Sequence, residues 1–319
     1  MLPCWDQHAW GAPGRVEVQV SPALETFVSK CKERDLRVGL SSWFRQDQTN
    51  ARLRLSSPQA LGEAWLAVLR RLDGAGLLDC VLYVDFTNEF PLRGWADFLY
   101  VGRDEPLFSR SEPWLARWMA DALAVPRRDY PGLGYTFSFC NELSQWQQQD
   151  VQALDLLELH IWMSLDEVSD FDQKVGYDIN ASYFDRTQYA NLIANGEREY
   201  RAAPSHWEGA LLRAIDDAAR WSRVAGKPLV TTEAWAVVNY KDFPMADWGW
   251  VKELCEFGVG AAAATGRWAA LCTSNFCGPQ FHGMWRDVAW HQRLTRTIHA
   301  SRADVSLARM PPAGSAERR

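Results

Sequence analysis

Apolar residues follow two alternating periodicities from residue 21 to about residue 300. After Ser21-Pro22, a helix N-cap followed by proline, the residues Leu24, Phe27 and Val28 share one helical face. The next segment, 36–44, is short and largely apolar, as is typical of a buried strand. The alternation recurs and predicts helices at about 21–31, 57–72, 112–124, 207–224, 248–257 and 286–302, and strands at 36–44, 81–89, 134–142, 156–162, 227–235 and 267–276. Such alternation indicates βαβ units and a mainly parallel sheet.

Polar and aromatic residues gather where the predicted strands end. In a (β/α)8 barrel the carboxyl ends of successive strands build the active site together. A doubly wound sheet usually concentrates its signal in one glycine-rich turn, and the chain contains neither a GxGxxG nor a GxxxxGKS/T motif. We therefore predict a TIM-type (β/α)8 barrel with six clear strands and a short N-terminal one, VEVQV at 16–20.

The chain lacks signs of division into several domains. No linker rich in Pro and Ser interrupts it, and no period of 20–50 residues repeats. We expect one barrel domain over residues 1–302, with a long polar insertion at about 165–206. The remaining residues, 303–319, are rich in Arg, Pro, Ala and Ser and are predicted to form a disordered tail.

Composition excludes several classes of protein. Of 319 residues, 47% are hydrophobic, which is too many for a disordered chain. The 34 Lys and Arg against 40 Asp and Glu give a net charge of −6, and no run of five basic residues occurs. Nucleic acid and anionic membrane are therefore not expected as partners, because both select clustered positive charge. No stretch of 18 uncharged apolar residues suggests a membrane span.

The cysteines and the N-terminus bear on the compartment. The seven cysteines are scattered without CxxC spacing, so neither a disulfide framework nor a zinc site is indicated. The first ten residues, MLPCWDQHAW, lack the basic and apolar regions of a signal peptide. We expect a cytoplasmic protein.

Tryptophan is enriched several-fold over its usual frequency, with 17 residues in the chain. Core packing accounts for several of them. Flat aromatic rings also stack on sugar rings, nucleobases and quaternary ammonium groups. Since the charge disfavours nucleic acid, carbohydrate becomes the leading ligand class.

Two motifs resemble those of the clan A glycoside hydrolases, closest to cellulase-like members. The strand YVDFTNEFP (83–91) resembles the fourth-strand motif, and PLVTTEAW (228–235) resembles the seventh-strand motif. Two predicted strands lie between them, as the clan requires. The sixth-strand segment LHIW (159–162) is similar to the clan's His-x-aromatic pattern. The resemblance covers about residues 21–300.

The resemblance implies a retaining glycoside hydrolase that needs no cofactor or metal. Glu89 would be the general acid/base and Glu233 the nucleophile, while Asn88 would bind the sugar 2-hydroxyl. Retaining enzymes pair two such carboxyl groups, one protonating the leaving oxygen and one attacking the anomeric carbon. The pair Asn141-Glu142 is a competing copy of the first motif, although only one predicted strand separates it from Glu233.

The strand count leaves two barrel strands to be placed upstream. If Glu89 ends the fourth strand, then 36–44 is the third, and only about twenty residues precede the first helix. VEVQV fits a rim feature better than a full barrel strand. We expect that this reading frame is truncated at its N-terminus, which would also leave room for a hidden signal.

Further candidate residues follow from their places at strand ends. Asp85 is expected to point into the barrel in a structural role. The predicted substrate-binding residues, each with a core or rim position as its alternative, are Asn88, His160, Trp162, Trp235, Trp43, Arg45, Asn141, Asn275 and Trp285.

Two other functions stay open at this point. One is a non-catalytic carbohydrate-binding barrel, which would keep the pocket without turnover. The other is a metal-dependent hydrolase, which the six histidines disfavour because they show no HxH or HExxH spacing. The sequence indicates neither the sugar nor the oligomeric state.

Overall fold

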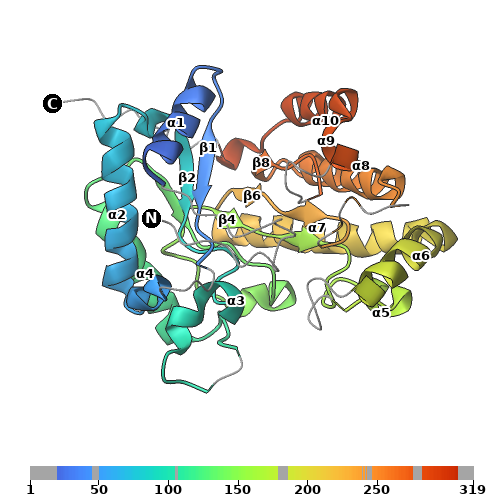
Figure 1. The fold of residues 1–319 in the computed structure, drawn as a ribbon, viewed down its shortest axis with the longest axis horizontal. Helices are drawn as coiled ribbons and strands as arrows, with labels where there is room; N and C mark the ends of the chain where they lie inside the picture. The colour runs from blue at the N-terminus through green and yellow to red at the C-terminus, as the bar shows by residue number, and fades with distance from the viewer. Residues whose placement is uncertain are drawn as a thin grey trace. The chain divides into compact units, whose positions relative to one another are not determined.

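The computed structural model describes residues 20–44, 50–104, 107–178, 186–238, 240, 242, 246–275 and 282–307. The chain forms two compact units. Unit 1 comprises Met1–Phe139, Gln147–Leu157 and Arg309–Arg319, and unit 2 comprises Cys140–Trp146 and Glu158–Ala308. Figure 1 shows strands and helices alternating along the chain in both. The assignment of residues 1–302 to a single domain stays a prediction.

Unit 1 contains a parallel three-stranded sheet of order β1-β2-β3, formed by β1 (Val38–Ser41), β2 (Val81–Asp85) and β3 (Gly134–Thr136). Its α-helices are α1 (Val20–Lys32), α2 (Pro58–Gly74), α3 (Arg93–Ala96) and α4 (Pro113–Arg127). Short 3-10 helices cover Ala51–Leu55, Leu78–Cys80 and Asp97–Tyr100.

Helices α2 and α4 pack closely because of one glycine. Ser57 caps α2 by accepting a hydrogen bond from the Ala60 N–H at 3.2 Å, and Pro58 opens the helix. A Cβ atom on Gly62 would lie 2.6 Å from the Ala122 carbonyl oxygen and from Val125. Only glycine therefore permits this helix–helix approach.

Unit 2 continues the parallel pattern with shorter strands. The sheet of order β4-β6-β8 contains β4 (Leu157–Glu158), β6 (Leu229–Thr231) and β8 (Trp268–Leu271), and β5 (Ile161–Trp162) pairs with β7 (Ala234–Trp235). The α-helices are α5 (Phe171–Val175), α6 (Arg186–Ala202), α7 (Pro204–Ala225), α8 (Gly249–Ala264), α9 (His282–Trp285) and α10 (Val288–Ala300). The 3-10 helices are Leu143–Gln148 and Val305–Leu307.

All six predicted strand positions are confirmed, but two of them are interrupted. The segment 156–162 forms β4 and β5 with a break at 159–160, and 227–235 forms β6 and β7 with a break at 232–233. Hydrogen bonds still join the two segments: the N–H of Leu159 donates to the Val230 oxygen at 3.0 Å, and that of Ile161 to the Glu233 oxygen at 3.2 Å. The breaks lie at His160 and Glu233, two residues of the candidate site, which are not part of the regular strands.

The predicted insertion at 165–206 contains two helices that the sequence pattern missed. Helix α6 is mostly polar, and its apolar stripe is reduced to Tyr189, Leu192 and Tyr200, which are buried. Hydrophobic periodicity therefore gave too weak a signal there.

Both ends of the chain extend beyond the described residues. Of VEVQV, the structure describes only Val20, the residue at which α1 begins. Residues 303–307 of the predicted tail take part in the fold: Asp304 pairs with buried Arg267 at 3.3 Å, and its N–H donates to the Gly266 oxygen. Among the helices described here, none has the length and apolarity to cross a bilayer.

Candidate active site

The first part of the site is a buried carboxylate that fixes the strand ends of unit 1. Asp85, the last residue of β2, is 1% exposed. It accepts hydrogen bonds from the Ser41 hydroxyl at 2.6 Å and from the hydroxyl and N–H of Ser138, both at 2.8 Å. Asp85 thus ties the end of β1 to the segment after β3, in the structural role expected for it.

Glu89 lies on the turn that follows β2 and is half-buried. Its backbone has a φ of 44°, in the left-handed region that non-glycine residues rarely adopt. The turn is fixed because the Glu89 N–H donates to the Ser138 hydroxyl at 3.0 Å. The Trp95 indole N–H donates to the Glu89 carboxylate at 2.7 Å, so the carboxylate has a defined orientation.

Asn88 precedes Glu89 and is 2% exposed. Its backbone N–H donates to the Ser42 oxygen at 2.9 Å, while its side-chain Nδ2 is buried and makes no hydrogen bond within the described part of the chain. An unsatisfied buried donor costs about 1–3 kcal/mol. Such a group is expected to be satisfied by a bound ligand.

Two tryptophans accompany Glu89 in unit 1. Trp43 is partly exposed, and its ring lies 4.8 Å from that of Trp95, which is 4% exposed. Trp95 contacts both Trp43 and Glu89, and the sugar-binding role of Trp43 stays a prediction. Arg45 lies outside the described residues.

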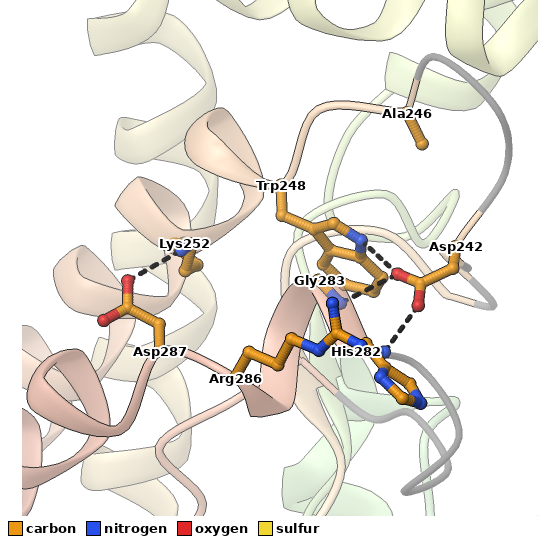
Figure 2. A pocket seen from close by; sticks show the side chains of 8 residues that line it. All are labelled: Asp242, Ala246, Trp248, Lys252, His282, Gly283, Arg286 and Asp287. Carbon is orange, nitrogen blue, oxygen red and sulfur yellow. Dashed lines mark hydrogen bonds and ion pairs between the residues drawn. The ribbon is translucent and has the colours of Figure 1, made fainter.

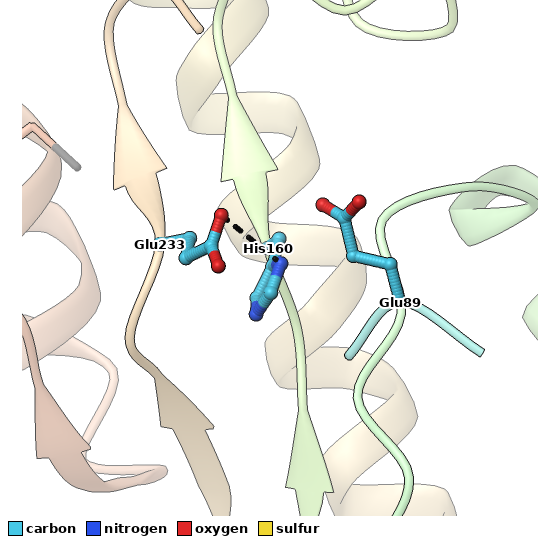
Figure 3. Close-up of side chains that lie close together, drawn as sticks. All are labelled: Glu89, His160 and Glu233. Atoms are coloured by element: carbon cyan, nitrogen blue, oxygen red, sulfur yellow. Dashed lines mark ion pairs between the residues drawn. The ribbon is translucent and has the colours of Figure 1, made fainter. Parts of the chain in front are cut away.

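Unit 2 holds the second glutamate. Glu233 occupies the break between β6 and β7 and is 8% exposed. His160, in the matching break between β4 and β5, is 1% exposed, and its Nδ1 lies 3.7 Å from Glu233 Oε2 (Figure 3). The structure thus brings His160 and Glu233 together within unit 2, whereas Glu89 belongs to unit 1.

Sequence reasoning missed a third member of this cluster. Glu158, the last residue of β4, is 1% exposed, and its Oε1 lies 3.9 Å from His160 Nε2. The Thr232 hydroxyl donates to the same Oε1. An acidic residue inside the apolar run LLELHIW is costly to bury unless it is paired, and that was the available signal.

The tryptophans that follow His160 and Glu233 are core residues in this structure. Trp162 is 1% exposed and Trp235 is fully buried. The Trp235 indole N–H donates to the Cys272 oxygen at 3.1 Å, and its ring covers Gly258, where a Cβ would lie 2.6 Å from it. Their burial favours the core alternative over a sugar platform.

Two predicted amides differ in how they are used. Asn275 is fully buried; its Oδ1 accepts from the Ala236 N–H at 3.0 Å, and its Nδ2 donates to the Val237 oxygen at 2.8 Å. It therefore positions the segment after β7. Asn141 is half-buried, and its Oδ1 has no hydrogen-bond partner among the described residues, so it keeps an acceptor for a ligand.

Trp285, on α9, is 43% exposed. Its ring stacks on His291 at 5.2 Å with an interplanar angle of 11°. His291 is itself within hydrogen-bond distance of Thr273 and of the Met284 oxygen. A rigid, exposed indole face of this kind suits stacking on a sugar ring.

Comparisons with known proteins identify the family of the chain. A family model described as "Cellulase-like: Sugar-binding cellulase-like" matches residues 1–299. The chain belongs to the Cellulase-like family. A search of curated proteins finds no match.

Solved structures extend the comparison of this Cellulase-like chain. A protein of Parabacteroides distasonis described as a candidate glycoside hydrolase is 44% identical, with a TM-score of 0.90 over 96% of this chain and 80% of that one. An endoglucanase (TM-score 0.52, 11% identity, 91% and 82% covered) and the cellulose synthase subunit Z of Clostridioides difficile (0.50, 11%, 86% and 78%) share the fold. The predicted resemblance to the clan A glycoside hydrolases is confirmed, and the parallel strands and alternating helices of the two units are consistent with a partial TIM-type barrel.

Asp242 is a second residue of the Cellulase-like chain that sequence reasoning missed. Figure 2 shows it beside a polar hollow of about 600 Å³ in unit 2. Its carboxylate accepts from the Trp248 indole at 2.8 Å and from the N–H groups of His282 and Gly283 at 2.5 and 2.9 Å. Asp242 thereby anchors the start of α9 and positions the helix that carries Trp285. No motif marks it.

Proposed function

We propose that this chain is a retaining glycoside hydrolase that cleaves a β-glycosidic bond in an oligosaccharide or glycoside. Glu233 attacks the anomeric carbon, while Glu89 protonates the departing oxygen. Glu89 then removes a proton from the water that releases the sugar from Glu233. The mechanism requires the two carboxyl groups to be about 5–5.5 Å apart during the reaction.

One observation carries the proposal: the buried, unsatisfied amide of Asn88 directly precedes Glu89. A sugar 2-hydroxyl accepts a hydrogen bond from such an amide, and this contact strengthens in the oxocarbenium-like transition state. The burial of Glu233 between the apolar strands β6 and β7 is also expected to serve a function, because burying an unpaired carboxylate costs free energy. Family membership supports both arguments.

Covalent trapping tests the proposal. The protein is incubated with a panel of activated 2-deoxy-2-fluoro glycosides, followed by intact mass spectrometry and peptide mapping. We expect a single sugar adduct on Glu233, and none in a Glu233→Ala variant treated in parallel. An adduct on another residue would refute the assignment of the nucleophile, and turnover with inversion at the anomeric carbon would refute the retaining mechanism.

Non-catalytic carbohydrate binding is the second candidate, favoured by the family's sugar-binding description and by the exposed rings of Trp43 and Trp285. Isothermal titration with the same sugars distinguishes it. Binding without turnover or adduct would support the second candidate, and a loss of turnover upon chelation would instead support a metal-dependent hydrolase.

A further inference from the structure

We infer that Glu158 is a positioning residue for the reaction, acting on the nucleophile Glu233 through His160. This inference rests on the proposed function and assigns a role to a residue outside both catalytic motifs. Its basis is the position of the His160 ring between two carboxylates within unit 2. His160 presents Nδ1 to Glu233 at 3.7 Å and Nε2 to Glu158 at 3.9 Å, so the imidazole has a carboxylate at each ring nitrogen.

Burial makes the charge on Glu158 effective. Glu158 and His160 are each 1% exposed, so water screens their interaction little. The Thr232 hydroxyl binds Glu158 Oε1, whereas Oε2 is buried and makes no hydrogen bond in the described part of the chain. A carboxylate with so few hydrogen bonds gains most of its stabilisation from a nearby positive charge. A protonated His160 is the group placed to provide it.

The same proton serves Glu233. An imidazolium held by Glu158 places positive charge beside the Glu233 carboxylate, and opposite charge at this distance favours the ionised form that a nucleophile needs. Without a negative charge on Glu158, a buried His160 would lose its proton more easily, because burial disfavours the charged form. Glu233 would then remain protonated up to a higher pH.

Other groups face this cluster. Directly after β8, the Cys272 thiol has a raised pKa because of burial and the charges of Glu233 and Glu158, so it stays neutral. Thr232 is uncharged. Glu89, the general acid/base of the proposed function, governs the basic limb of the pH profile rather than the acidic one. The acidic limb therefore reports on Glu233 and His160.

A Glu158→Gln variant tests the inference. Glutamine has nearly the same shape and keeps one oxygen that can accept from Thr232, while the second oxygen becomes a neutral NH2 group, so the negative charge is removed. We expect the midpoint of the acidic limb of kcat/KM to rise by roughly one pH unit, which is about a tenfold loss of activity below it, with little loss at the optimum. Glu158→Asp, which keeps the charge, should restore the wild-type limb in part.

A matched control and a direct readout complete the experiment. Asp172 is also a buried carboxyl group of unit 2, 5% exposed, so Asp172→Asn should leave the acidic limb unchanged. Proton NMR of His160 should show a lower titration midpoint in Glu158→Gln than in the wild type, a reading that needs no turnover. An unmoved limb together with an unmoved His160 titration would overturn the inference, whereas a wild type that forms no adduct and turns over no glycoside would overturn the proposed function alone.

Discussion

The two glutamates of the proposed site are held in different ways by the two units. In unit 1, neutral groups hold Glu89 on a half-exposed turn: the Ser138 hydroxyl accepts a hydrogen bond from its backbone N–H, and the Trp95 indole donates one to its carboxylate. In unit 2, Glu233 lies in a buried cluster with His160 and Glu158. A group that gains and loses a proton suits the first setting, and one that must stay ionised suits the second. The difference shows that the local environment of each glutamate can determine which one acts as acid/base and which one as nucleophile.

The largest effect is expected from Glu233→Ala. Without the nucleophile no covalent intermediate forms, so kcat should fall by about 10⁴-fold or more on every substrate. Steady-state kinetics with aryl glycosides measures it. Retention of more than a tenth of the wild-type kcat would contradict the assignment of Glu233 in unit 2 as the nucleophile.

Glu89→Ala should cost less, and its cost should depend on the leaving group. General acid catalysis contributes about 10²–10⁴-fold to the rate. A substrate whose leaving group needs no proton should lose little of the rate at which the sugar is transferred to Glu233. The comparison is made between a dinitrophenyl glycoside and the matching natural glycoside. Equal losses on both would contradict the acid role of Glu89.

Asn88→Ala should lower kcat/KM by about 10–100-fold, the value of one or two hydrogen bonds in the transition state. Because Nδ2 has no hydrogen-bond partner among the described residues, thermal stability should change less than for Asn275→Ala, whose amide holds the backbone at residues 236 and 237. Kinetics and thermal unfolding of both variants check this. Similar destabilisation of the two would argue that Asn88 is structural.

The last effect concerns the pH dependence of stability in unit 2 and leaves the chemistry of the site unchanged. Burial, helped by the charges of Asp166 and Asp178, raises the pKa of Asp172 to about 8. The folded state therefore binds a proton that the unfolded state has released, and the contribution of Asp172 to stability is lost as pH rises from about 4 to about 8. Relative to Asp172→Asn, the wild type should lose on the order of 1 kcal/mol per pH unit there. Urea unfolding at several pH values measures the slope, and parallel curves for the two proteins would contradict it.

The sequence predicted the strand positions well, because apolar runs are local signals. The roles of Glu89 and Glu233 rest on short motifs and stay predictions. Helix α6 was missed because its apolar stripe is thin, and the breaks at His160 and Glu233 were missed because periodicity carries no information on a two-residue interruption. Trp162 and Trp235 were placed as sugar platforms, yet they are buried. Whether a tryptophan faces the core or a ligand depends on neighbours such as Gly258, distant in sequence. The partners of Asp242 and Glu158 are likewise set by tertiary contacts.

The left-handed backbone at Glu89 affects how a mutation at this position changes stability when it removes catalytic activity. A glycine would adopt a φ of 44° without the steric cost of a β-carbon, roughly 1 kcal/mol, so Glu89→Gly should unfold at a higher temperature than Glu89→Ala. Inactivation by that single exchange would relax the backbone even as it removes the chemistry. Loss of the catalytic carboxyl group by Glu89→Gly is therefore not opposed by a loss of folding stability from the backbone at this position. Only selection for catalytic activity opposes it.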